Sequence, residues 1–272
     1  MLVFPKAKIN LGLKITRKRN DGYHDIETIF YPVNLCDALE AVADPGSSGK
    51  DVLTVTGNQI TVNEQDNLVI KAVNELRETY NFPFLRIHLH KVIPAGAGLG
   101  GGSSDAAFML RNINRIFNLN LSDEYLRTVA LHLGSDCPFF IDCRPSYASG
   151  RGEILEPMDG FLRGYHIVLL NPGINVSTKE AYENCIPDLP ASLLKNTISY
   201  PVAEWRYMIT NDFEKTVFTR YPFIGDLKSA LYESGSLFSS MSGSGSTVFG
   251  IFGSPPHLPE KIGRYVIFRG VL

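Results

Sequence analysis

The sequence has few of the features that mark secreted or membrane proteins. Its 272 residues include only four cysteines, Cys36, Cys137, Cys143 and Cys185, and none of them forms a Cys-x-x-Cys pair. This is too sparse for a secreted disulfide framework, so we expect reduced packing residues, with reactivity an alternative for Cys137 because Asp136 is its neighbour. No stretch approaches the roughly 18 apolar residues that a membrane helix needs, and no basic, apolar leader opens the chain. These absences predict a cytoplasmic protein.

The chain also lacks an excess of charge of either sign. It carries 26 Lys and Arg against 28 Asp and Glu, a formal net charge of -2. Without a broad basic field, neither nucleic acid nor an anionic membrane surface is expected as a partner, and any anion must be bound locally. The composition, 44% hydrophobic and 20% charged, is that of a globular protein with a sizeable core. Its length suggests two modest domains.

Strand and helix signals alternate along most of the chain, without repeats or low-complexity tracts. Apolar periodicity and turn residues predict strands at 2–16, 27–33, 52–55, 59–62, 85–92, 139–141, 166–170, 247–252 and 265–268. They predict helices at 67–80, after the glycines near residue 100, from 122 to 134, and at 178–184, 202–209 and 223–234. We place a domain boundary in the glycine-containing break near residue 160, giving domains 1–160 and 161–272 of an α+β fold.

A glycine-rich loop joins the strand at 85–92 to the helix that follows it. Five glycines let the backbone approach an anion closely, and the helix N-terminus adds about half a positive charge. Ser103 or Ser104 can cap that helix. The pattern therefore predicts a phosphate cradle. It differs from a dinucleotide-binding fingerprint, which needs an acid at the end of the next strand, and from a P-loop, which needs a lysine before the serine.

Such a loop needs positive charge from elsewhere to balance a triphosphate. Magnesium and a distant lysine are the obvious sources. Lys6 and Lys8 are candidates, because on a strand they share one face. The residues predicted to form this phosphate-binding site are Asn67, Lys91, Pro94, Gly96, Gly98, Leu99, Gly100, Gly101, Gly102, Ser103 and Ser104.

Three segments together resemble the motifs of the GHMP kinase superfamily in order and approximate spacing. They are Ala7-Lys8-Ile9-Asn10-Leu11, the loop from Pro94 to Ala107, and Met241-Ser242-Gly243-Ser244-Gly245-Ser246-Thr247. Asp21-Gly22-Tyr23-His24 and the segment from Gly134 to Phe140 narrow the resemblance to a branch that acts on a cytidine-diphosphate-linked methylerythritol. The resemblance spans essentially the whole chain. It implies a two-domain kinase fold with a catalytic cleft between the domains.

The resemblance implies transfer of a phosphoryl group from ATP, with Mg²⁺, to a hydroxyl of that substrate, giving its 2-phosphate in the non-mevalonate isoprenoid pathway. It makes Lys8 and Asp136 the catalytic pair. The family usually has the sequence Pro-Ala-Lys here, but in this chain Lys6 lies between Pro5 and Ala7. Lys8 is chosen as the catalytic lysine because Ile-Asn-Leu follows it directly. The implied substrate-binding residues are Asn10, Tyr23, His24, Tyr182, Ser242, Gly243, Ser244 and Gly245.

Residue chemistry agrees with this assignment and leaves alternatives open. A carboxylate near a lysine stays ionised and can accept the hydroxyl proton, and an aromatic face with a ring nitrogen suits a pyrimidine base. Another kinase of the superfamily, acting on mevalonate, homoserine or a sugar, is the nearest alternative. A non-catalytic metabolite-binding relative is the second, and the retention of both Lys8 and Asp136 argues against it.

Overall fold

The computed structural model describes residues 1–46, 49–59, 63–183, 185–188 and 193–272. Contacts divide the chain into two units that are each discontinuous in sequence. Unit 1 comprises residues 1–7, 35–95 and 100–143, and unit 2 comprises residues 8–34, 96–99 and 144–272. The division at residue 160 is a different one and stays a prediction about sequence domains.

Unit 1 contains a four-stranded sheet in the order β1-β4-β6-β5. Its strands are β1 (Leu2–Val3), β4 (Ala38–Ala43), β5 (Val52–Gly57) and β6 (Leu85–Lys91). β6 lies antiparallel to β4 and parallel to β5. Buried and exposed residues alternate strictly along β6, as its apolar and polar alternation predicts. One face of the sheet is therefore available for helices to cover.

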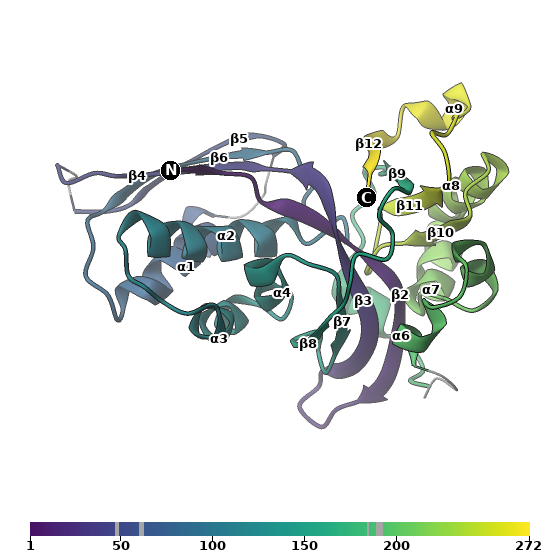
Figure 1. The fold of residues 1–272 in the computed structure, drawn as a ribbon, viewed down its shortest axis with the longest axis horizontal. Coiled ribbons are helices and arrows are strands. Elements are labelled where there is room, and N and C mark those ends of the chain that lie inside the picture. The colour runs from purple at the N-terminus through teal and green to yellow at the C-terminus, as the bar shows by residue number, and fades with distance from the viewer. Residues whose placement is uncertain (47–48, 60–62, 184, 189–192) are drawn as a thin grey trace. The chain divides into compact units, whose positions relative to one another are not determined.

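Four helices of unit 1 lie on one side of this sheet (Figure 1). They are α1 (Leu68–Arg77), α2 (Gly101–Ile116), α3 (Asp123–Leu133) and α4 (Cys137–Asp142), and a short 3₁₀ helix at Glu64–Asp66 precedes α1. Asn67 caps α1 by accepting from the Val69 amide, and Ser122 caps α3 by accepting from the Tyr125 amide. Their apolar faces pack together, and α2 contacts α1, α3 and α4.

The strand predicted at 139–141 is wrong, because these residues belong to α4. Pro138 lies in the first turn of α4, where a fixed φ and a missing N–H favour a helix start. Phe139 and Phe140 are both buried, with their rings edge to face at 4.9 Å between centroids. A short apolar run of this kind fits a strand or a buried helix equally well by periodicity.

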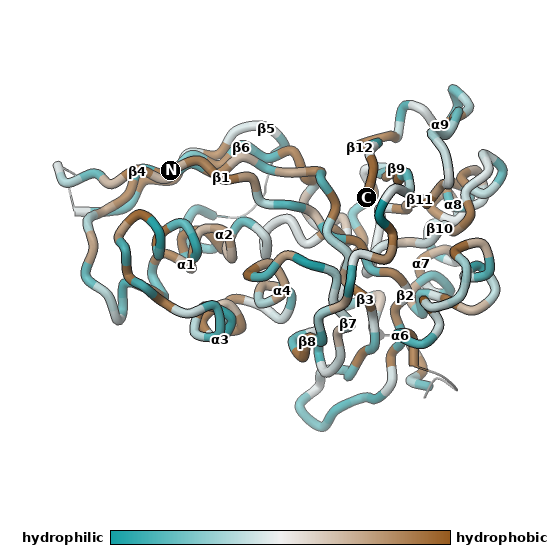
Figure 2. The backbone as a smooth tube through the Cα atoms, in the orientation of Figure 1, coloured by the Kyte–Doolittle hydropathy of each residue, from teal (hydrophilic) through white to brown (hydrophobic). Residues whose placement is uncertain are grey.

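Unit 2 begins with two long strands, β2 (Lys6–Lys18) and β3 (His24–Cys36), whose outer ends belong to unit 1. The turn between them is hydrophilic (Figure 2) and contains Gly22 at φ +86°, as the Asn-Asp-Gly sequence predicts. β7 (Ser146–Ser149) and β8 (Ile154–Pro157) complete a sheet in the order β2-β3-β7-β8.

The second sheet of unit 2 has the order β10-β11-β9-β12 and is antiparallel throughout. Its strands are β9 (His166–Leu170), β10 (Phe238–Met241), β11 (Val248–Phe252) and β12 (Val266–Val271). The helices of this part are α5 (Thr178–Glu183), α6 (Leu194–Thr197), a 3₁₀ helix at Val202–Tyr207, α7 (Phe213–Arg220), α8 (Pro222–Glu233) and α9 (Glu260–Gly263). Leu13 and Ile15 of β2 pack with Val168 and Val248 in one buried cluster, which joins the two sheets of unit 2.

Several predicted elements change in detail. The strand expected at 59–62 falls mostly on residues outside those described. The helix expected at 202–209 is a 3₁₀ helix that ends at Tyr207. The sequence signals miss β4, β7, β8, β10, α6, α7 and α9. α2 begins at Gly101 with Gly100 as its N-cap, so the prediction that Ser103 or Ser104 caps it is wrong. Both serines lie in the first turn.

Candidate functional site

The glycine-rich loop has a backbone that only glycine adopts readily. Gly96, Gly98 and Gly100 have φ values of +62°, +75° and +70°, in the left-handed region. The chain then enters α2 directly, so the first amide groups of this helix have no partner within it. These donors, with the helix dipole, suit a phosphate group.

Close approach of other segments also requires glycine in this loop. A Cβ on Gly98 would lie 1.9 Å from the carbonyl oxygen of Ser242. The Ser242 hydroxyl donates to the Gly98 carbonyl at 2.7 Å, and the Thr247 amide donates to the Ala97 carbonyl at 3.3 Å. Within unit 2 the loop is therefore bonded to the serine- and glycine-rich segment at 241–247.

Lys8 is joined to the same loop. Its amide donates to the Leu99 carbonyl at 2.9 Å, and its side chain is buried on β2. The Lys8 ammonium donates to Asn10 Oδ1 at 2.7 Å and lies 4.5 Å from the centroid of the Phe30 ring. Lys6 is part-exposed and belongs to unit 1. These contacts favour Lys8 as the functional lysine.

The segment at 241–247 combines satisfied and unsatisfied backbone groups. Gly243 and Gly245 have φ values of +54° and +88°. Among the described residues, the amides of Gly243 and Ser244 donate no hydrogen bond, whereas the Ser244 hydroxyl lies 3.1 Å from the Thr178 hydroxyl. Because the Ser242 hydroxyl hydrogen is used on Gly98, Ser242 organises the loop, and the two amides remain as donors for a bound anion.

Asn211 holds this segment in place, and sequence reasoning misses it. Its buried side-chain amide donates to the carbonyls of Met241 and Gly243, both at 2.8 Å, and its oxygen accepts from the Phe213 amide at 3.0 Å. The signal in the sequence is one asparagine just before a helix, which reads as an ordinary cap.

A buried triad of charged groups lies under the start of α2 in unit 1. The Lys91 ammonium donates to Asp37 and, at 2.7 Å, to Asp105 Oδ2. Asp37 also accepts from the amides of Val92 and Ile93, directly after β6. Burial opposes the charge on Lys91, but the two carboxylates outweigh it and raise the pKa of Lys91. The triad thus connects the end of β6 to the first turn of α2.

Asp105 differs from Asp37 in how well it is satisfied. Its Oδ1 atom is buried with no hydrogen-bond partner among the described residues, and burial raises the pKa of Asp105 to about 8. A Cβ on Gly101 would lie 3.3 Å from the Lys91 nitrogen, so Lys91 supports the loop from beneath. Asn67, also predicted to bind ATP, uses its side-chain oxygen to cap α1.

Asp136 immediately precedes α4 and is partly exposed in unit 1. Its side chain does not cap that helix, although its position after Gly134 would also suit a simple capping role. The neighbouring Cys137 is fully buried, and burial raises its pKa to about 12. Cys137 is thus a packing residue, and all four cysteines are free thiols.

The predicted base-binding residues lie in unit 2. The rings of His24 and Tyr182 are stacked, with 4.9 Å between centroids and 17° between planes, and Tyr182 meets Phe213 edge to face. Tyr23 is 56% exposed, and the Arg151 guanidinium lies 5.0 Å from its ring centroid. Burial, followed by the charge of Lys18, lowers the pKa of His24. A neutral His24 ring has one donor and one acceptor nitrogen.

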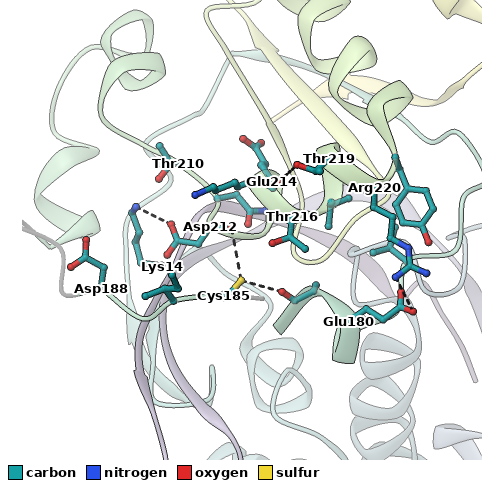
Figure 3. Close-up of a pocket in the computed structure, with 17 residues that line it drawn as sticks. Lys14, Glu180, Cys185, Asp188, Thr210, Asp212, Glu214, Thr216, Thr219 and Arg220 are labelled. Atoms are coloured by element: carbon teal, nitrogen blue, oxygen red, sulfur yellow. Dashed lines mark hydrogen bonds and ion pairs between the residues drawn. The ribbon is translucent and has the colours of Figure 1, made fainter. Parts of the chain in front are cut away.

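A separate cavity of about 810 Å³ opens beside α5 and α7 in unit 2 (Figure 3). Lys14 and Asp212 point toward each other across it at 2.9 Å, and Arg220 pairs with Glu180 at 3.2 Å. Asn211 is in its wall. None of the catalytic or binding residues predicted from the sequence lines this cavity, although Ala181, the neighbour of Tyr182 on α5, does.

The described residues contain no group of three His, Cys, Asp or Glu side chains that could hold a metal ion by themselves. Magnesium usually keeps several waters and binds through one or two carboxylates together with substrate phosphates. In the part of the chain that the structure describes, no helix is long and apolar enough to cross a membrane.

Comparisons with known proteins agree with this arrangement. Residues 67–143 match the model of the GHMP kinases N terminal domain, and residues 202–270 match that of the GHMP kinases C terminal domain. Together these matches cover more than half of the chain. The chain belongs to the GHMP kinase family, which confirms the resemblance drawn from its motifs and the fold class expected from it.

One relative is a 4-diphosphocytidyl-2-C-methyl-D-erythritol kinase of Parabacteroides distasonis, which is 49% identical over 96% of this chain and 95% of its own length. A solved 4-(cytidine 5'-diphospho)-2C-methyl-D-erythritol kinase matches with a TM-score of 0.75 and 31% identity, covering 92% of this chain and 90% of its own. A homoserine kinase from Cytophaga hutchinsonii covers 92% and 86%, with a TM-score of 0.59 and 17% identity, and shows the shared fold alone.

Proposed function

We propose that this protein phosphorylates a hydroxyl of 4-diphosphocytidyl-2-C-methyl-D-erythritol with ATP, giving the 2-phosphate. The observation that carries the proposal is the 49% identity, over nearly the whole of both chains, to a kinase named for this substrate. The motifs that narrow the resemblance to this substrate, Gly22-Tyr23-His24 and Asp136 to Phe140, are intact. A kinase acting on mevalonate, homoserine or a sugar is not favoured.

In the proposed reaction, the substrate hydroxyl attacks the γ-phosphorus of ATP while its proton passes to the Asp136 carboxylate. The bond from the γ-phosphorus to the β,γ-bridging oxygen breaks, and ADP leaves. The Lys8 ammonium, oriented by Asn10, stabilises the negative charge on the transferred group. Catalysis of this kind depends on positioning and charge stabilisation more than on covalent chemistry.

The ATP phosphates are proposed to bind the amides at the start of α2 and the glycines that precede them. A Cβ at Gly98 would meet the backbone of Ser242, and one at Gly101 would meet the side chains of Ile93 and Lys91, so both positions need glycine for the packing that holds these amides in place. Mg²⁺ bound with the nucleotide would neutralise phosphate charge.

The cytosine base is proposed to bind at the aromatic turn of unit 2. Tyr23 offers an exposed face that Arg151 steadies from the other side. His24, kept neutral by its lowered pKa, can donate to or accept from the edge of the base. Because His24 covers one face of Tyr182 in this structure, the base must displace it to lie between Tyr23 and Tyr182.

A kinase assay with purified protein tests the proposal. With ATP and Mg²⁺, we expect turnover of 4-diphosphocytidyl-2-C-methyl-D-erythritol and none of mevalonate or homoserine, with the product identified by ³¹P NMR. Asp136→Asn should lower kcat by about 10²–10⁴-fold while leaving ATP affinity nearly unchanged. Asp226→Asn, at an exposed position on α8, is the matched control. Faster turnover of mevalonate or homoserine would show that the substrate is wrong.

A further inference from the structure

A chain of hydrogen bonds leads from Lys8 into the core of unit 2. Asn10 Oδ1 accepts from the Lys8 ammonium at 2.7 Å, and Asn10 Nδ2 donates to the Thr28 hydroxyl at 3.0 Å. The Thr28 hydroxyl in turn donates to the Gly12 carbonyl at 2.5 Å. Lys8, Asn10 and Thr28 are 4%, 2% and 0% exposed, so water does not substitute for these partners.

The direction of every bond in this chain is fixed by one hydrogen atom. A hydroxyl has a single hydrogen, and the Gly12 carbonyl can only accept, so Thr28 must donate to Gly12. The Thr28 oxygen can then only accept a hydrogen bond from Asn10. The donor nitrogen Nδ2 of the Asn10 side chain must therefore face Thr28. The amide oxygen Oδ1 is thereby turned toward the Lys8 ammonium.

Without Thr28 only the Lys8 ammonium would hold the side-chain amide of Asn10 in this orientation, and Nδ2 would have lost its partner. Rotation by 180° would exchange oxygen and nitrogen and set an NH₂ group against an ammonium, a contact of two donors. Oδ1 also lies 3.3 Å from the position of a Cβ on Gly243, so the oriented amide is in the same region as the segment at 241–247. The backbone N–H of Asn10 donates to the Ser242 hydroxyl at 3.2 Å and so fixes the backbone of β2 beside this segment.

We propose that Thr28 is a positioning residue for phosphoryl transfer, which orients the amide of Asn10 and through it the ammonium of Lys8. This rests on the proposed role of Lys8 in catalysis. Thr28 touches neither substrate, and it acts from β3, where its backbone pairs with Ala148 of β7. Its place inside a sheet makes the orientation rigid, because the hydroxyl cannot move without the strand.

Two substitutions separate the hydroxyl from the shape of the side chain. Thr28→Val keeps the branched shape and removes both hydrogen bonds, whereas Thr28→Ser keeps the hydroxyl. We expect Thr28→Val to lower kcat about tenfold or more, with KM for ATP within about twofold of the wild type. The reason is that the buried Nδ2 group of Asn10, the residue that holds the Lys8 ammonium, loses its hydrogen-bond partner. Thr28→Ser should recover most of kcat. Thr54→Val, at an exposed position on β5, controls for the exchange itself.

A double-mutant cycle tests whether Thr28 acts through Asn10. In an Asn10→Ala background, Thr28→Val should cause no further loss of kcat, because the group that it orients is absent. Full additivity of the two losses would overturn the proposal. So would wild-type kcat in Thr28→Val, or a loss that follows only the folded fraction measured by thermal unfolding.

A measurement without turnover distinguishes this inference from the proposed function. The side-chain amide of Asn10 gives its own pair of ¹⁵N–¹H resonances, and we expect these to shift and exchange faster with solvent in Thr28→Val but not in Thr28→Ser. If the wild type lacked activity on the proposed substrate while these shifts were seen, the function would be wrong and the orienting role right. Unchanged Asn10 resonances in Thr28→Val would refute the orienting role.

Discussion

Replacing Gly98 by alanine is the sharpest test of the phosphate-binding loop. The added Cβ would lie 1.9 Å from the Ser242 carbonyl oxygen, 2.9 Å from its carbon and 3.2 Å from the Gly245 nitrogen. All three atoms are backbone, so no side chain can rotate away. The left-handed φ of +75° costs about 1–2 kcal/mol for alanine, and the overlap adds about 1–3 kcal/mol, as for overpacking elsewhere.

Gly96 provides a control within the same loop. It also has a left-handed φ, +62°, but a Cβ there meets only the Asn175 side-chain oxygen at 3.3 Å. Gly96→Ala should therefore carry the conformational cost alone. Gly263→Ala, in open space with an ordinary φ, should carry neither.

Calorimetric titration with ATP and thermal unfolding measure the two consequences. We expect ATP affinity to fall for Gly98→Ala by up to about fivefold to 150-fold beyond any loss in Gly96→Ala, since the overlap costs about 1–3 kcal/mol and about 1.4 kcal/mol corresponds to tenfold. The unfolding temperature should fall in the same order. If Gly98→Ala bound ATP as well as Gly96→Ala, the packing of this loop against the segment at 241–247 would not matter for the nucleotide.

Three further predictions follow from the lysines, the buried acid and the aromatic turn. Lys8→Ala should lower kcat by orders of magnitude and Lys6→Ala should leave it nearly unchanged; steady-state kinetics showing the reverse would make Lys6 the functional lysine. With a pKa near 8, folded Asp105 keeps a proton that the unfolded chain loses near pH 4, so stability falls as pH rises between these values, by up to about 1.4 kcal/mol per unit. Urea unfolding at pH 5 and 7.5 should show a shallower fall for Asp105→Asn, and an equal fall would refute the assignment. His24→Ala should weaken discrimination between cytidine and uridine substrates in kcat/KM while sparing KM for ATP, whereas an unchanged ratio would remove His24 from base recognition.

Many of the regular elements and the glycine-rich loop between β6 and α2 could be predicted because their signals are local. Strict alternation defines β6, and glycines between a strand and an apolar helix define the loop and α2. The prediction of a strand from Phe139 to Ile141 was wrong because a run of three apolar residues has no periodicity that distinguishes a strand from a helix. The prediction that a serine caps α2 was wrong because Gly100 occupies the N-cap position, where serine is also common.

The polar partners of the site could not be predicted because they are distant in sequence. Asp37 contacts Lys91, which is 54 residues away in sequence, and the backbone N–H of Asn10 donates to the Ser242 hydroxyl, which is 232 residues away. Nothing local marks Asp37, Thr28 or Asn211 as different from an ordinary turn, strand or cap residue. Only the tertiary structure shows that each one fixes a group that the motifs do reveal.

The two buried lysines, Lys8 and Lys91, are fixed by different elements of the fold. Lys91 donates to two buried carboxylates, Asp37 and Asp105, so its charge is balanced inside unit 1 and its main effect is to tie β6 to α2. Within unit 2, the groups described around the Lys8 ammonium are an amide oxygen and the face of an aromatic ring. Within unit 2, these two groups direct the ammonium from β2 and β3. Lys91 therefore fixes the start of α2 from within unit 1, whereas Lys8 is oriented by Asn10 of its own strand and by Phe30 of the neighbouring strand.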